Sequence, residues 1–229
     1  LIVLSERDYI ATLSEYGDTG TTSGALGLLS GATWGGSGSG TTIRYNFLDD
    51  VPSYYRSTAQ ERLGFQGFNA QMRSATEEIL NQIETFTNIT FTKSAQTSQQ
   101  ITFGQAYLGE GIGGWAYYPN STDARGGDVW TNRGYSNTQN PEDGNYAKLL
   151  LLHEIGHALG LQHSFERLSG VEASSQYSVM AYDWSPYYPS GYMLYDVYAL
   201  QRLYGANMAH ATGDDVYDLN SKNIAYAIW

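Results

Sequence analysis

The sequence predicts a mixed α/β (α+β) fold, in which a twisted mixed β-sheet is covered by three helices. Two observations favour this architecture. Five short stretches have the alternation or the β-branched and aromatic content of strands, and three others repeat apolar residues with helical spacing. At 229 residues the chain is long enough for one domain, or two small ones, with a sizeable core.

The expected strands are all short. Residues 41–47 (TTIRYNF) alternate between polar and apolar side chains, as on a half-buried strand. Four more strands are expected at residues 89–92, 100–103, 115–118 and 128–131. Before the first strand, the chain is rich in Gly, Ser and Thr, so residues 1–40 are expected to form a loop-rich N-terminal segment.

The three expected helices differ in pattern. Residues 68–86 carry apolar side chains three and four apart, which predicts an amphipathic helix. The second helix follows Pro and two acids at residues 141–143, where a helix should start, and runs to about Leu159. It is apolar nearly all round and therefore buried. Residues 193–204 form the last helix, with Gly205 as its stop.

Three of the four histidines fall within residues 153–163. On a helix, His153 and His157 are four apart and lie on one face. His163 comes six residues later and would face away if the helix continued. Gly160 can end the helix in a left-handed conformation, so that the chain turns back and brings His163 beneath the other two. Three imidazoles of this kind bind zinc and leave a fourth position for water.

Glu154 flanks the same helix face and would act as general base on that water, later passing the proton to the leaving amine. The alternative is a set of histidines satisfied by ordinary hydrogen bonds. The apolar surroundings argue against it, because polar groups set into a buried helix need partners, which a metal supplies. Glu172 competes as third ligand, but the spacing from Gly160 favours His163.

Composition disfavours several classes of function. The net charge of −11 disfavours nucleic acid and anionic membrane surfaces, which attract basic patches. No apolar run approaches the roughly 18 residues of a membrane span. Because there is no cysteine, thiolates cannot hold the zinc and disulfides are excluded. The GxGxxG pattern at residues 109–114 is not followed by a helical pattern, so a dinucleotide site is not expected.

The zinc motif HExxHxxGxxH is followed by residues 178–182 (Ser-Val-Met-Ala-Tyr), and together they resemble the metzincin metallopeptidases. Within that clan, residues 88–91 and 196–207 look like the corresponding segments of serralysins. The resemblance runs from about residue 41 to residue 229. It implies a metzincin-type zinc protease domain with an active-site helix and two further helices.

The resemblance also implies roles for single residues. Met180 would lie under one catalytic zinc ion as a hydrophobic base. Tyr182 would ligate the zinc and swing away to stabilise the transition state. Ser164 departs from the pattern, because serralysins usually have proline there. A second departure is the lack of the GGxGxDxUx repeats of a C-terminal calcium β-roll, although the resemblance allows for a calcium ion near residues 213–215.

The function implied is that of a zinc endopeptidase acting on extended polypeptides. Substrate would lie antiparallel to an edge strand that includes Gly114, Trp115, Ala116 and Tyr117. Backbone pairing of this kind tolerates many sequences, so broad specificity is expected. Residues 184–188 would wall the pocket beyond the scissile bond.

The same resemblance implies a secreted, extracellular, bacterial protein, and we expect a monomer. A proteinaceous inhibitor is a further candidate partner. Residues 41–209 would form the catalytic domain, with an upper part to residue 160 and a lower part after it. Residues 210–229 would begin a linker towards a missing C-terminal region.

Two alternatives to this function stay open. One is a catalytically inactive, zinc-containing binding module, against which the intact Glu154 and Tyr182 argue. The other is a matrixin-like metzincin of narrower specificity, which a profile of cleavage sites would distinguish from a broad enzyme.

Overall fold

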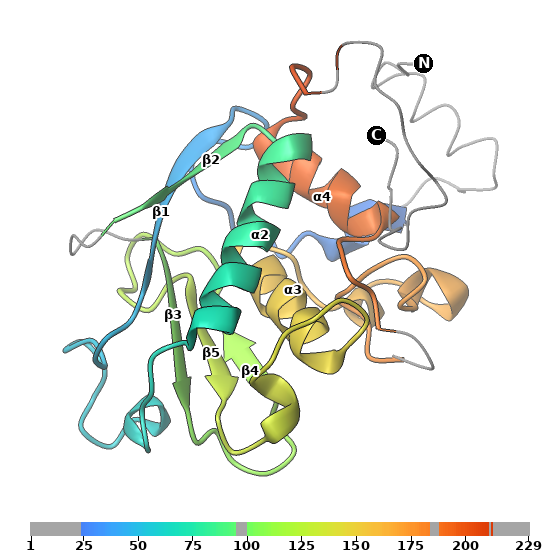
Figure 1. Cartoon of the computed structure of the whole chain (residues 1–229). Coiled ribbons are helices and arrows are strands. Elements are labelled where there is room, and N and C mark those ends of the chain that lie inside the picture. Colours follow the sequence, from blue (N-terminus) through green and yellow to red (C-terminus); the bar gives the residue numbers. More distant parts are fainter. Residues whose placement is uncertain (1–23, 95–99, 184–187, 211, 213–229) are drawn as a thin grey trace.

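The computed structural model describes residues 24–94, 100–183, 188–210 and 212. Within them, a five-stranded sheet carries three α-helices, α2, α3 and α4, which lie to one side of it (Figure 1). The predicted fold class is therefore confirmed. None of the helices in these ranges is long and apolar enough to cross a membrane.

The sheet has the strand order β2-β1-β3-β5-β4. Four of its strands run parallel, and only β4 is antiparallel to its neighbour. The strands are β1 (Thr41–Phe47), β2 (Ile89–Lys93), β3 (Ile101–Ala106), β4 (Gly114–Ala116) and β5 (Asp128–Asn132). All five predicted strands are present, with β3 longer and β4 shorter than expected. Every residue of β3 and β5 is buried, as is usual for parallel strands covered on both faces.

The amphipathic helix α2 (Ala70–Phe86) begins after Asn69, whose side chain accepts a hydrogen bond from the Met72 amide at 2.9 Å. The last helix, α4 (Leu194–Tyr204), ends at Gly205 as predicted. The prediction for the start of α3 (Tyr146–Ala158) is wrong by several residues. The Pro and acids at 141–143 lie in the preceding loop, because Asn145 caps the helix through the Lys148 amide at 2.9 Å.

Two apolar clusters lie on opposite faces of the sheet. Successive side chains of a strand point to opposite faces of the sheet. In β5, for example, Val129 belongs to the larger cluster and Trp130 to the smaller one. The larger cluster also contains side chains from α2, α3 and α4, so it joins the helices to the sheet. This packing places α3 against the edge strand β4.

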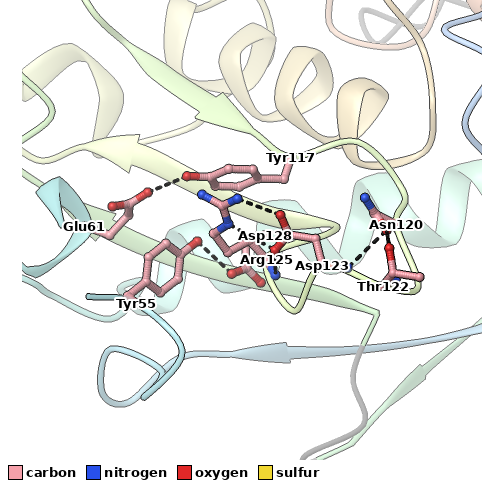
Figure 2. Close-up of polar contacts among 8 residues, drawn as sticks. All are labelled: Tyr55, Glu61, Tyr117, Asn120, Thr122, Asp123, Arg125 and Asp128. Carbon is pink, nitrogen blue, oxygen red and sulfur yellow. Dashed lines mark hydrogen bonds and ion pairs between the residues drawn. The ribbon is translucent and has the colours of Figure 1, made fainter. Parts of the chain in front are cut away.

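On the other face, the buried carboxylate of Asp128 accepts three hydrogen bonds (Figure 2 shows the one from Tyr55). Its donors are the hydroxyl groups of Tyr54, Tyr55 and Thr102, at 2.9, 2.8 and 2.6 Å. Burial raises the pKa of Asp128 to about 6, although these hydrogen bonds act in the opposite direction. The network attaches the loop after β1 to the start of β5.

Candidate metal centre

Helix α3 carries the first two histidines of the predicted site. His153 and His157 project from one face of the helix, and their Nε2 atoms are 3.1 Å apart. Both side chains are buried. Main-chain carbonyl groups hold their other ring nitrogens: His153 Nδ1 is 2.9 Å from the Val179 oxygen, and His157 Nδ1 is 2.7 Å from the Leu161 oxygen.

The end of α3 brings in the third histidine. Gly160 has a φ of 104°, and a Cβ atom there would lie 2.2 Å from the carbonyl oxygen of Ala32. Only glycine suits such a backbone conformation and so close an approach. The chain turns after it, and His163 Nε2 comes within 3.2 Å of His157 Nε2. The expectation that the helix ends at Gly160 and that the chain turns back is confirmed.

The three imidazoles present the donor set that a metal ion needs. The nearest partners of the Nδ1 atoms are two carbonyl groups and the carboxylate of Glu166, all of which accept hydrogen bonds. Each Nδ1 therefore carries the proton, and three Nε2 lone pairs face one another. Lone pairs so close repel unless a cation lies between them. Among the described residues this triad is the one group of His, Asp and Glu that could hold an ion.

Electrostatics also suit neutral imidazole ligands. Burial lowers the pKa of His153 to about 4 and lowers the pKa of His157 well below its ordinary value. Zinc binds deprotonated ring nitrogens, so a low pKa removes the competition from protons. On these grounds the residues present fit a zinc ion.

Glu154 lies beside the triad with an unsatisfied oxygen. Its carboxylate is buried, and Oε2 has no hydrogen-bond partner among the described residues. Burial raises the pKa of Glu154 to about 8. Gly114 of the edge strand makes room for it, since a Cβ atom there would be 3.1 Å from Glu154 Oε1. An orphaned, buried carboxylate oxygen points to a missing ligand or water at this position.

Met180 packs against helix α3. It is fully buried, and its sulfur would be 2.7 Å from a Cβ atom placed on Gly156. Residues 178–182, the Met180 segment, are held by Asp196 of α4, a residue that the sequence analysis missed. Its buried carboxylate accepts hydrogen bonds from Ser178 Oγ at 2.6 Å and from the Val179 amide at 2.8 Å. Because the Val179 carbonyl in turn contacts His153, Asp196 positions that imidazole indirectly.

Tyr182 reaches the triad from the same segment. Its hydroxyl oxygen is 2.8 Å from His163 Nε2, and 53% of the residue is exposed. The structure thus brings together His153, His157, His163, Glu154, Met180 and Tyr182. Their roles as ligands, base and transition-state donor remain predictions.

The expected substrate strand is divided between two faces. Gly114 and Ala116 lie on the α3 side, whereas Trp115 and Tyr117 pack against the smaller apolar cluster on the other face. The Tyr117 hydroxyl donates to Glu61 at 2.7 Å, as Figure 2 shows. Tyr118, the last residue of the predicted strand, meets the His157 ring edge-on, with the ring centroids 5.6 Å apart.

Other residues considered from the sequence lie elsewhere. Glu172, the competing third ligand, accepts a hydrogen bond from the Tyr195 hydroxyl at 2.7 Å and is not part of the triad. Of the expected pocket wall, residues 184–187 lie outside the described residues. So do residues 213–215, near which a calcium ion was expected.

Comparison with known proteins identifies the family. The Peptidase_M10 profile, described as matrixin, matches residues 55–205. The chain belongs to the matrixin family of peptidases. Zinc metalloendopeptidases make up this family, so the predicted class of enzyme is confirmed at the level of the family.

This matrixin is also similar to curated bacterial proteins. It is 34% identical over 218 residues to Serralysin C and 36% identical over 213 residues to Serralysin A, both of Dickeya chrysanthemi. These matches confirm the resemblance to serralysins. Each covers 82% of this chain, which spans only 45% and 44% of the two relatives. Among solved structures, that of myroilysin matches 79% of this chain and 99% of its own, with a TM-score of 0.49 and 16% identity.

Proposed function

We propose that residues 41–209 form the catalytic domain of a secreted zinc endopeptidase that hydrolyses peptide bonds in extended polypeptides. One observation carries the proposal. Three Nε2 atoms converge at 3.1 and 3.2 Å, and the carboxylate beside them has an unpartnered buried oxygen. Histidines that merely stabilise a core would have no reason to aim three lone pairs at one another.

The zinc ligands would be His153, His157 and His163. Neighbouring side chains would transfer the proton and stabilise the transition state. When bound, zinc supplies Lewis-acid chemistry by polarising a peptide carbonyl and by making water at the open position more acidic. Glu154 Oε2 takes the proton from the attacking water and delivers it to the nitrogen of the leaving amine. The Oε2 atom of Glu154 has no other hydrogen-bond partner among the described residues and is therefore available to accept that proton.

Tyr182 donates a hydrogen bond to the oxygen of the scissile carbonyl as negative charge develops there. Two observations support this role. The hydroxyl already lies 2.8 Å from His163 Nε2, and half of the side chain is exposed, so that it has room to move. Met180, buried beneath α3, provides a firm apolar base for the site.

Substrate pairs antiparallel with β4, which is the outermost strand of the described sheet. Main-chain pairing makes few demands on side chains, so the proposal includes broad specificity. The side chains of Trp115 and Tyr117 point to the far face, and the amide and carbonyl groups of Tyr117 already bond to Asp128 and Gly127. In this antiparallel register, Gly114 and Ala116 offer the outward backbone groups. Extracellular location rests on the resemblance to serralysins.

Digestion of an unfolded, generic protein tests the proposal. Wild-type protein should cleave it, a zinc chelator should stop cleavage, and added zinc should restore it. Glu154→Gln keeps the size of the side chain but cannot accept the proton, and it should lose at least about 10²-fold in rate. If the variant kept the wild-type rate, the mechanism would be wrong. If zinc-loaded, folded wild-type protein cut nothing, the binding module would become the better proposal.

A further inference from the structure

The three imidazoles are not held in the same way. The Nδ1 atoms of His153 and His157 meet main-chain carbonyl groups inside the protein. His163 lies nearer the surface, with 23% of its side chain exposed, and its Nδ1 is 3.1 Å from Glu166 Oε1. The Glu166 side chain therefore orients the imidazole of His163, whereas main-chain carbonyl groups orient the other two imidazoles.

The turn that carries Glu166 is itself anchored. It is a single 3-10 turn, η4 (Ser164–Glu166), directly after His163. Ser164 is fully buried, its amide donates to the Met180 carbonyl at 3.2 Å, and its hydroxyl donates to the Ala173 carbonyl at 2.6 Å. Proline, which the resemblance led us to expect at position 164, has no amide proton for the first of these bonds. Serine thus ties the turn to the Met180 segment.

The turn also places an aromatic ring on the face of the same imidazole. The rings of Phe165 and His163 are stacked, with centroids 4.9 Å apart and planes at 11°. Phe165 lies 5.0 Å from the Tyr182 ring as well, and 48% of the residue is exposed. A large apolar side chain so exposed gains little from burial, and its contacts here are with the metal-site residues. His163 is therefore restrained at its edge by Glu166 and on its face by Phe165.

We propose that Glu166 is a positioning residue of the metal centre. Its carboxylate accepts the Nδ1 proton of His163 and so fixes the tautomer and ring orientation that present the Nε2 lone pair to the ion. The inference rests on the proposed function, since it presumes that the triad binds zinc. Groups in this position typically change metal affinity about 10–100-fold.

Removal of the Glu166 carboxylate should change zinc affinity and folding stability to different extents. Glu166 and His163 are both partly exposed, and exposed ion pairs contribute little to stability. A purely structural role would therefore change neither quantity much. An orienting role would weaken zinc binding and leave the unfolding of the metal-free protein nearly unchanged.

The experiment measures zinc affinity by competition with a chelator, together with the visible spectrum of the cobalt-substituted protein. Glu166→Ala should bind zinc about 10–100-fold more weakly and give an altered cobalt spectrum. Glu166→Gln keeps an oxygen that can accept the same proton, so it should recover most of the affinity. Glu110→Ala removes an equal charge from an exposed position and should match wild type.

Each outcome separates the two proposals. Wild-type protein that binds no zinc would overturn the proposed function together with this inference. Zinc binding by Glu166→Ala within about twofold of wild type, with an unchanged cobalt spectrum, would overturn the inference alone. A Glu166→Gln variant as weak as Glu166→Ala would contradict the hydrogen bond as the cause. Thermal unfolding of the metal-free proteins verifies that all variants fold.

Discussion

At the scale of the residue, the site depends on which atoms have partners and which do not. The Nδ1 atom of each triad histidine has an acceptor, whereas Oε2 of Glu154, itself an acceptor, has no donor among the described residues. Satisfied groups fix orientation, and the unsatisfied oxygen is the one available for chemistry. Tyr182 adds a hydroxyl group that can reach the same space.

Replacing Tyr182 by Phe tests the role of that hydroxyl group. The variant keeps the ring, so we expect zinc affinity near that of wild type, while kcat falls on the order of 10²-fold because a donor to the developing oxyanion is lost. Steady-state kinetics on a fluorogenic peptide and the chelator competition supply the two readouts. Tyr107→Phe, at an exposed tyrosine outside the site, is the matched control. A loss of zinc binding with kcat unchanged would contradict the proposed role.

At the scale of the element, two short connections build the site. The turn at Gly160 ends α3 and redirects His163, and the Met180 segment closes the site from below. Asp196 holds the latter segment with two hydrogen bonds, from Ser178 Oγ and from the Val179 amide, and it caps its own helix by accepting a third from the Met193 amide. The helices supply the rigid frame, whereas these connections set the position of the third histidine and of Met180.

Substitution of Gly160 by Ala should disrupt the turn. The added Cβ atom would meet the Ala32 oxygen at 2.2 Å, and the positive φ is itself strained for alanine. We expect a loss of at least about 2 kcal/mol in the free energy of unfolding, measured with urea, and weaker zinc binding. Gly144→Ala is a matched control, because Gly144 has a φ of 77° but nothing within 4 Å of its Cβ position. Equal losses in both variants would show that the close approach to Ala32 has no effect.

Substitution of Asp196 by Asn should loosen the Met180 segment. The Asp196 carboxylate accepts hydrogen bonds from two main-chain amides. In the variant, the side-chain NH₂ group would replace one carboxylate oxygen, so a buried donor would lose its acceptor. We expect unfolding to become easier by about 1–3 kcal/mol in thermal or urea denaturation. Asp49→Asn, at an exposed carboxylate, should change stability by less than about 0.5 kcal/mol. A variant as stable as wild type would refute the anchoring role.

At the scale of the whole molecule, the sheet separates the metal centre from the network of Figure 2. Val129 and Trp130 illustrate the separation, because they are neighbours in the chain yet belong to clusters on opposite faces. The far face holds a buried charge, Asp128, within a protein whose net charge is already −11. Burial makes the ionisation of Asp128 unfavourable in the folded state, so the free energy of unfolding depends on pH.

Asp128 should make the protein less stable as pH rises. Its pKa is about 6 in the folded chain against 3.8 for the unperturbed group, so the folded state binds the proton more tightly. Its contribution to stability is fully present below pH 3.8 and is lost as pH rises through 6. Relative to Asp128→Asn, which does not titrate, wild type should lose on the order of 3 kcal/mol across this window.

Urea denaturation of wild type and Asp128→Asn at several pH values between 4 and 7 measures this difference. Other carboxylates titrate in both proteins, so the difference between the two curves isolates Asp128. Asp49→Asn removes an exposed carboxylate and should run parallel to wild type. Parallel curves for Asp128→Asn as well would show that the buried carboxyl group has an ordinary pKa.

Periodicity and spacing made most of the fold and part of the site predictable. Apolar residues three and four apart indicated α2, and the four-residue interval put His153 and His157 on one face, since both patterns are local. The start of α3 was predicted wrongly, because a hydrogen bond from the Lys148 amide to the Asn145 side chain sets it, rather than the proline and acids before it. Substrate binding along Gly114, Trp115, Ala116 and Tyr117 stays a prediction, although strand alternation turns the side chains of Trp115 and Tyr117 to the far face.

By itself, then, the sequence determined the elements, the zinc motif with its glycine turn and the family resemblance, because each depends on residues close together in the chain. Only the tertiary structure decided how that site is supported. Asp196 acts through hydrogen bonds to residues of another segment, and Glu166 acts through one to the imidazole of His163. The local sequence around either residue does not indicate those partners. The same holds for Asp128 on the far face of the sheet. Burial and hydrogen bonding are properties of the folded chain, so they become known only when segments distant in the sequence lie side by side.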